Sequence, residues 1–125
     1  MAGGFILKIR VKAMATRERL PNRRTSESFT FELHGLRFTA TVSRFDDGRI
    51  GELFLNNHKH GNQTDTNARD SAIILSFALQ HGADIESIRR ALCRNDQGRA
   101  LGPVGAALDL LLIGNALAEP AQAAE

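Results

Sequence analysis

The amino-acid sequence predicts an α+β fold, in which an antiparallel three-stranded meander is packed by about three C-terminal helices. Two observations predict this fold class. Apolar and polar residues alternate, as in half-buried strands, over residues 28–33, 36–45 and 49–55. The apolar residues then recur at helical spacing, which predicts helices at about residues 66–81, 84–93 and 103–113. Consecutive strands joined by short turns pair antiparallel, and the helices that follow must cover one face of the sheet.

Two tight turns connect the predicted strands. His34-Gly35 joins the first strand to the second, and Asp46-Asp47-Gly48 joins the second to the third. Asp47-Gly48 is a strong hairpin signal because glycine takes a positive φ at no steric cost. Phe45 falls among the polar positions of its strand, and therefore predicts a bulge or a late crossover at that point.

Each predicted helix has its own boundary signals. Asp65 or Thr66 can cap the first helix, and Gly82 is expected to end it. Asp84 can cap the second helix, and Pro103 fits the first turn of the third. The apolar faces should meet in one core, for which the sequence predicts Phe31, Phe38, Val42, Leu53, Ile73, Phe77, Ile88 and Leu108.

The chain of 125 residues is long enough for one core, and it predicts one domain over residues 25–114. Residues 1–24 are expected to form a basic N-terminal extension, and residues 115–125 a flexible C-terminal tail. Within the extension, residues 1–13 alternate like a strand, yet no turn leads from them into a partner strand. Met14 is therefore a second candidate for the start of the native product.

The charge is unevenly placed along the chain. Residues 1–24 hold seven basic side chains and one acidic one, whereas the rest of the chain holds nine basic and thirteen acidic side chains. Such a basic arm can contact the phosphates of a nucleic acid, or it can be a solvated tail. Nucleic-acid binding is the weaker of the two interpretations, because no aromatic residues interleave with the arginines to stack on bases.

Composition also argues against several functional classes. No apolar run approaches the roughly 20 residues of a membrane helix, and Phe5-Ile6-Leu7 is too short for a signal-peptide core. Cys93 is the single cysteine, so the chain can form no internal disulfide, and a small buried hydrophobe is a more common role for it than a nucleophile. We expect a cytoplasmic protein with no membrane contact, no cofactor and no catalytic residue of its own.

The polar loop between the third predicted strand and the first predicted helix is the candidate binding site. Unpaired amides and the helix dipole favour an anion there, and Lys59 can add a point charge on a phosphate. The same pattern is typical of a structural loop with an ordinary cap. His58 and His60 could bind a metal, but no third ligand stands at ligand spacing, and we expect no metal. The candidate ligand-binding residues are Arg49, His58, Lys59, Gly61, Asn62, Thr64 and Asn67.

Several runs of residues resemble a known family. They are Asp47–Leu55, His58–Gly61, Ala68–Ala72, Ala78–Gly82, Ile88–Leu92 and Gly102–Asp109. Over about residues 19–113, in this order and without large gaps, the chain resembles a TSCPD domain. The family is similar to a domain near the C-terminus of adenosylcobalamin-dependent (class II) ribonucleotide reductases, and it also occurs as stand-alone small proteins. The resemblance implies an α+β fold, in agreement with the predicted strands and helices.

The chain departs from this family at the stretch that names it. Leu101-Gly102-Pro103-Val104-Gly105 stands where the family has Thr-Ser-Cys-Pro-Asp, so no thiol is present there. Ribonucleotide reduction by this family's relatives requires a thiyl-forming cysteine and a redox pair, whereas this chain has one cysteine in all. We therefore expect no reductase activity from these 125 residues alone.

Three functions follow from these observations. The first is a non-catalytic interaction or regulatory module, which acts through a ribonucleotide reductase or another protein partner, or by self-association. The second is a protein that binds a nucleotide or another phosphorylated small molecule at the polar loop. The third is nucleic-acid binding through the basic arm. We also expect a homodimer, because a three-stranded sheet leaves its edges unpaired and the Phe29–Leu33 strand has only Glu32 to protect it.

Overall fold

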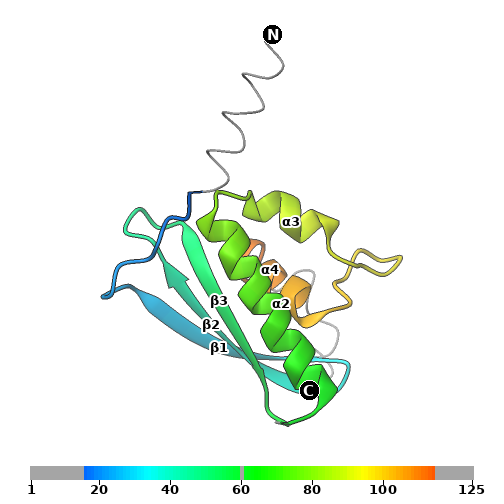
Figure 1. The fold of residues 1–125 in the computed structure, drawn as a ribbon. Coiled ribbons are helices and arrows are strands. Elements are labelled where there is room, and N and C mark those ends of the chain that lie inside the picture. The colour runs from blue at the N-terminus through cyan, green and yellow to red at the C-terminus, as the bar shows by residue number, and fades with distance from the viewer. Residues whose placement is uncertain (1–15, 60, 115–125) are drawn as a thin grey trace.

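The computed structural model describes residues 16–59 and 61–114, and it confirms the predicted fold class (Figure 1). An antiparallel sheet of three strands is followed by three helices in the described residues. The elements are β1 Ser26–Leu33, β2 Leu36–Arg44, β3 Ile50–Asn57, α2 Gln63–Gln80, α3 Ile85–Ala91 and α4 Pro103–Leu112. The expectations for residues 1–13 and 115–125 lie outside the described residues.

The sheet is a meander in the order β1-β2-β3, joined by the two predicted turns. Gly48 has a φ of 93°, the conformation for which the turn requires glycine. The register shifts between Ser43 and Arg44, which confirms the predicted bulge. The shift turns the Phe45 side chain toward the interior, where only 6% of it is exposed.

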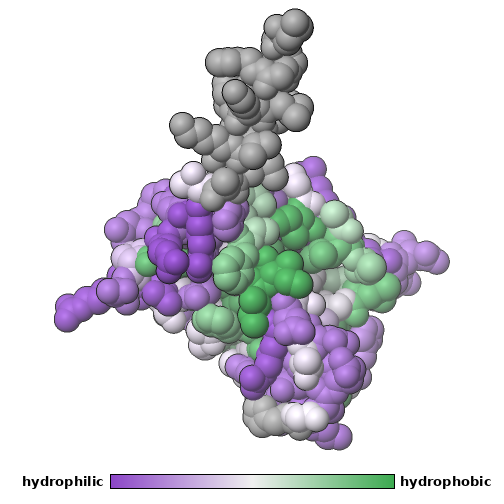
Figure 2. Space-filling view, viewed as in Figure 1, coloured by the Kyte–Doolittle hydropathy of each residue, from purple (hydrophilic) through white to green (hydrophobic). Residues whose placement is uncertain are grey.

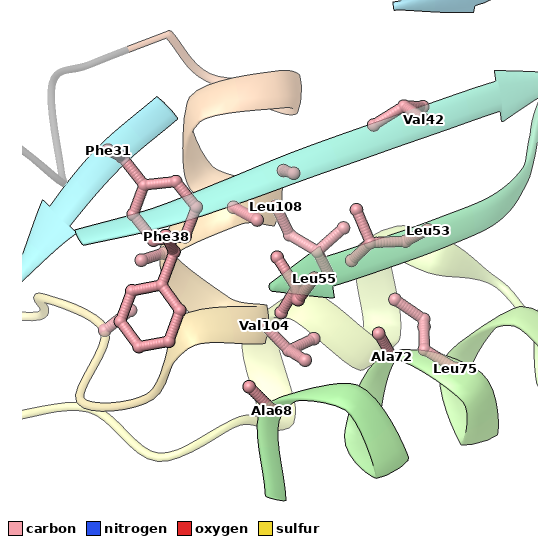
Figure 3. Packing of buried hydrophobic residues seen from close by; sticks show 14 of the residues in the cluster. Phe31, Phe38, Val42, Leu53, Leu55, Ala68, Ala72, Leu75, Val104 and Leu108 are labelled. Atoms are coloured by element: carbon pink, nitrogen blue, oxygen red, sulfur yellow. The ribbon is translucent and has the colours of Figure 1, made fainter. Parts of the chain in front are cut away.

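The core lies between one face of the sheet and the helices (Figure 3). Phe31, Phe38 and Val42 point from β1 and β2 toward Val104 and Leu108 of α4. Alternation along the strands puts these side chains on a single face, as the sequence predicts. Five of the predicted core residues are buried, namely Phe31, Phe38, Val42, Leu53 and Leu108, and Ile88 is partly buried against them.

Helix α2 closes the outer edge of β3 with polar side chains. Ser76 Oγ accepts a hydrogen bond from Leu53 N at 2.9 Å, and it lies 3.1 Å from Leu53 O, to which its hydroxyl can donate. Gln80 Nε2 donates to Gly51 O at 2.9 Å. These backbone groups would otherwise be unpaired at the sheet edge, so the helix takes the place of a fourth strand.

The contact between α2 and β3 repeats because the spacing of residues along the helix matches the spacing along the strand. Gly51 and Leu53 are two residues apart on β3, a rise of about 6.7 Å. Ser76 and Gln80 are four residues apart on α2, a rise of about 6 Å. Because the two distances nearly match, successive turns of α2 meet successive outward-facing peptide groups of β3. No described strand pairs with the outer edge of β1, and dimer formation through that edge stays a prediction.

The prediction of two core residues is wrong. Ile73 and Phe77 are 44% and 46% exposed, because α2 is rotated so that its smaller and more polar residues face the sheet. Ala68 and Ala72 bring the helix backbone close to β3, and Ser76 reaches the strand edge from the same side. The bond between Ser76 and β3 fixes this rotation, since turning Phe77 inward would leave Leu53 N without a partner.

The helix ends differ from the prediction in detail. Gly82 has a φ of 92° and follows the end of α2, as expected. The Asp84 carboxylate caps α3 by accepting from Ser87 N at 3.0 Å, also as expected. Helix α3 ends at Ala91, before residue 93, so Cys93 lies in the following loop. The expectation that this cysteine is buried is wrong, because Cys93 is exposed.

Replacing Ser76 by alanine tests the contact between α2 and β3. The Ser76→Ala variant leaves a buried backbone N–H of Leu53 unsatisfied, and we expect a loss of about 1–3 kcal/mol in the free energy of unfolding. Ser71→Ala is the matched control, because Ser71 lies on the same helix but its exposed hydroxyl binds only Asn67 O. Urea unfolding of the three proteins gives the comparison. Equal losses in both variants would contradict the edge contact.

Candidate functional site

The loop after β3 is held to the sheet by its own side chains. His58 Nε2 lies 2.8 Å from Thr39 Oγ1, and His58 N donates to Arg37 O at 2.9 Å. Lys59 N donates to Asn57 Oδ1 at 2.9 Å, while the Lys59 side chain is exposed. The loop therefore presents the exposed Lys59 side chain next to residues that are hydrogen-bonded to the sheet.

Asn62 caps α2, not Asp65 or Thr66 as the sequence predicts. Asn62 Oδ1 accepts from Asp65 N at 2.8 Å. Asp65 cannot serve as the cap because its carboxylate is used elsewhere. It is buried, and its Oδ1 accepts from Asn57 N at 3.0 Å, which extends the closure of the β3 edge to the start of α2.

The structure brings together six of the seven predicted ligand-binding residues. His58, Lys59, Gly61 and Asn62 follow one another in the loop, and Thr64 and Asn67 lie exposed in the first turns of α2. The Asn67 side chain is engaged locally, since its Oδ1 accepts from Gln63 Nε2 at 2.9 Å. Anion binding by this loop stays a prediction.

Arg49 is the one predicted ligand-binding residue that lies away from the loop after β3. It precedes β3 and lies at the opposite end of that strand from His58. Its side chain donates to Asp47 Oδ2 at 2.7 Å and to Glu18 Oε1 at 3.0 Å, and its guanidinium lies 4.6 Å from the centroid of the Phe45 ring. Arg49 therefore stabilises the β2–β3 turn and is not part of the loop cluster.

A buried ionic cluster that the sequence did not predict joins α3, α4 and the loop between them. The side chain of Asp109 is 0% exposed. Its Oδ1 accepts from Arg94 Nη2 at 2.8 Å and from Arg89 Nη1 at 3.1 Å, and its Oδ2 accepts from Arg94 Nη1 at 2.8 Å. Glu86 pairs with Arg89 on its outer side. One sequence feature could have predicted this cluster, namely a single aspartate among the apolar residues of α4. A carboxylate that is buried in this way requires hydrogen-bond donors from elsewhere in the chain.

The electrostatics of this cluster keep it charged. Burial raises the pKa of Asp109, but hydrogen bonds from Arg94 and Arg89 outweigh burial and hold the net pKa below its usual value. The hydrogen bond from Arg89 lowers the pKa of Glu86 to about 2. Arg89 and Arg94 donate to both oxygens of the Asp109 carboxylate, so we assign the cluster a structural role.

Part of the surface on the helical side of the molecule is apolar. A groove of about 430 Å³ lies where α2, α3 and α4 meet. Beside it, Ile74 and Phe77 are 70% and 46% exposed on the outward face of α2. Figure 2 shows hydrophobic residues gathered on this face of the molecule. We call the groove and this helix face together the apolar surface; it comprises Ile73, Ile74, Leu75, Phe77, Ala78, Ile88, Leu92 and Val104.

The sequence did not predict the apolar surface, because its apolar pattern assigned Ile73 and Phe77 to the core. The polar residues Ser76 and Gln80, which face β3, are the sequence feature that indicates how α2 is rotated. Within residues 16–59 and 61–114, no helix is long and apolar enough to cross a membrane.

Two variants of the polar loop separate its structural role from ligand binding. Asn62→Ala removes the cap of α2, and we expect it to cost about 0.5–2 kcal/mol of unfolding free energy. Lys59→Ala should leave stability within about 0.5 kcal/mol of the parent, because the side chain is exposed. If the loop binds phosphate groups, Lys59→Ala should weaken nucleotide binding by about 1.5–3 kcal/mol in calorimetry. Absence of nucleotide binding by the unmodified protein would refute the ligand site.

Replacing Asp109 by asparagine tests the buried cluster. Because two arginines lose their buried carboxylate partner, we expect Asp109→Asn to lose about 3–5 kcal/mol of unfolding free energy at neutral pH. The folded-state pKa of Asp109 is depressed, so its contribution is present above the usual value of 3.8 and is lost as the pH falls below it. The variant should therefore lose less stability than the parent on acidification. Asp96→Asn, at an exposed loop position, is the control and should leave both quantities unchanged.

Comparison with known proteins places this sequence in a family. The family model described as TSCPD domain matches residues 10–120. The chain is 37% identical over 70 residues to a vitamin B12-dependent ribonucleotide reductase of Agrobacterium fabrum, which covers 56% of this chain and 6% of that protein. It is 31% identical over 77 residues to the enzyme of the same name from Bradyrhizobium diazoefficiens, covering 62% of this chain and 6% of that protein.

A third relative is the vitamin B12-dependent ribonucleotide reductase of Rhodopirellula baltica, which is 35% identical over 72 residues, or 58% of this chain and 7% of that protein. The chain thus corresponds to only a small part of these relatives. No solved structure matches it. Because the family model covers most of its length, the chain belongs to the TSCPD domain family, and it is related to a segment of vitamin B12-dependent ribonucleotide reductases.

Proposed function

We propose that this chain is a non-catalytic interaction module that binds a protein partner through the apolar surface. The observation that carries the proposal is the exposure of Ile74 and Phe77 beside an apolar groove. Large apolar side chains that cluster around a groove are typical of protein-binding sites, because a partner gains about 25 cal/mol for each Å² of apolar surface removed from water.

The chemistry of the groove favours a protein over a polar metabolite. Ile88, Leu92 and Val104 contribute aliphatic walls from α3, the following turn and α4. Small ligands are recognised by a few convergent polar groups in an otherwise apolar pocket. The charged side chains of the Asp109 cluster, by contrast, are paired with one another. An aliphatic or aromatic anchor of a partner protein fits such walls.

The relatives suggest the class of partner. In each of the three, the matching segment is 6–7% of a much longer vitamin B12-dependent ribonucleotide reductase. A domain of the same family in a separate chain could bind to a reductase of that class and regulate it. We therefore infer that a vitamin B12-dependent ribonucleotide reductase of the same organism is the first partner to test.

Binding of that reductase should depend on Ile74. The Ile74→Lys variant places a charge in the apolar surface, and we expect it to weaken binding at least about tenfold, since a buried unpaired charge is costly at an interface. Its fold should persist because Ile74 is 70% exposed. Affinity can be measured by biolayer interferometry with the purified reductase.

Phe54→Lys is the matched control for this measurement. Phe54 is 43% exposed on β3, but its side chain lies on the face of the sheet opposite the core. The control should bind the reductase like the parent chain. The proposal is refuted if the parent chain does not bind, or if both variants weaken binding equally.

A further inference from the structure

The outward face of α2 is an apolar stripe with one charged side chain at each end. Figure 1 shows α2 on the outside of the fold, and Figure 2 shows hydrophobic residues gathered on this face. Ile74 is exposed near the middle of the stripe, and Phe77 follows one turn later. Asp70 is exposed one turn before Ile74. At the other end, the Arg17 guanidinium lies 4.5 Å from the centroid of the Phe77 ring.

The two charges at the ends of this stripe have no ion partner in the part of the chain that the structure describes. Neither Asp70 nor Arg17 forms a salt bridge there. Arg69, the neighbour of Asp70, is by contrast paired with Asp65 at 3.3 Å. Arg17 Nε donates to Gln80 Oε1 at 2.6 Å, a neutral acceptor that orients the guanidinium without neutralising it. One acid and one base on the same helix face are therefore available to an outside partner.

A second copy of α2 that crosses the first at Ile74 in the antiparallel direction matches these charges. In such a pair, a residue four positions before the crossing faces the residue four positions after it on the other helix. Asp70 is four positions before Ile74, and Phe77, which carries the Arg17 guanidinium, is three positions after it. At a rise of 1.5 Å per residue, the two positions differ by only about 1.5 Å along the axis. A long arginine side chain can bridge that difference.

We propose that this chain forms a two-fold symmetric dimer through antiparallel α2 helices, with Ile74 at the crossing and Asp70 of each copy paired with the partner's Arg17. The symmetry forms this ion pair twice. A parallel pair of helices would instead place the two Asp70 carboxylates opposite each other, so the charges favour the antiparallel direction. The contact also removes Ile73, Ile74 and Phe77 from water.

This dimer uses a different surface from the one that the sequence predicts for self-association, which is the outer edge of β1. It does not rest on the proposed function. Because Ile74 and Phe77 belong to the apolar surface, the dimer would compete with the partner proposed above, and that consequence does rest on the proposed function. The experiments below therefore use the full-length chain without the reductase.

Charge reversal tests the ion pair between the two copies. Asp70→Arg places an arginine opposite the partner's Arg17 at both ends, and we expect the dimer Kd to rise at least about tenfold. The double variant Asp70→Arg with Arg17→Glu restores opposite charges, and it should dimerise at least about tenfold more tightly than Asp70→Arg alone. Sedimentation velocity over a concentration series gives each Kd, relative to the monomer mass of 13.7 kDa. Asp96→Arg makes the same charge change at an exposed loop position and should leave the Kd unchanged.

A disulfide locates the crossing point. Packed helix axes lie about 8–10 Å apart and each Cα lies about 2.3 Å from its axis, so Cα atoms that face each other at a crossing are about 3–5 Å apart. That separation is short enough for a disulfide. In a Cys93→Ser background, Ile74→Cys should therefore link two copies when oxidised glutathione accepts the two electrons of the thiols and leaves as reduced glutathione. Non-reducing electrophoresis follows the linked dimer.

Thr30→Cys in the same background is the matched variant for the alternative dimer. Thr30 is exposed in the middle of β1, so a dimer through that strand edge would bring two copies of residue 30 together. We expect the Ile74→Cys link to form at least about tenfold faster than the Thr30→Cys link, because a preformed contact gives its thiols a high effective concentration.

Three results would overturn the inference. The first is a monomer throughout the concentration series. The second is a double charge variant that dimerises no more tightly than Asp70→Arg, with circular dichroism showing that both are folded. The third is a faster link through Thr30→Cys, which would assign the dimer to the edge of β1. None of these measurements involves the reductase, so failure here is distinguishable from failure of the proposed function, which the binding measurement with Ile74→Lys tests separately.

Discussion

The hydrogen bonds between α2 and the edge of β3 determine which surface this protein presents. Ser76 satisfies Leu53 N, and Gln80 satisfies Gly51 O, from one side of the helix. A helix bound in this way cannot rotate without leaving backbone groups of β3 buried and unpaired, which costs about 1–3 kcal/mol for each group. The opposite side of the same helix, with Ile74 and Phe77, must then face outward. The exposed apolar face is thus a consequence of closing the sheet edge.

The second wall of the groove depends on a different interaction. Helix α4 is apolar and carries Val104 into the groove, while Asp109 on its buried side binds Arg89 and Arg94. These bonds join α4 to α3 and to the loop that follows α3. Gly105 allows that loop to approach closely, since a Cβ atom there would lie 3.0 Å from the Ala100 Cβ. The groove is therefore formed by elements that are held from behind by polar contacts, and its walls are mostly apolar.

The sequence was sufficient for the fold but not for the rotation of α2 or for the site. Alternation, two turns and a misplaced Phe45 predicted the strands, their pairing and the bulge, because these signals are local. The burial of Ile73 and Phe77 was predicted wrongly because large apolar residues were given more weight than alanines. Ser76 and Gln80 bind residues 23 and 29 positions away, and such contacts cannot be inferred from helical spacing. The bonds of Asp109 to arginines 15 and 20 positions away were missed for the same reason.

The described end of the basic arm weakens the case for binding through charge. Arg24 pairs with Glu52 at 3.2 Å, and Arg17 binds Gln80 while stacking on Phe77. Cations held in this way against the domain are less available to phosphates than cations on a solvated tail, since each must exchange an internal partner for the nucleic acid. Arg17 and Arg24 therefore hold the described end of the arm against α2 and β3.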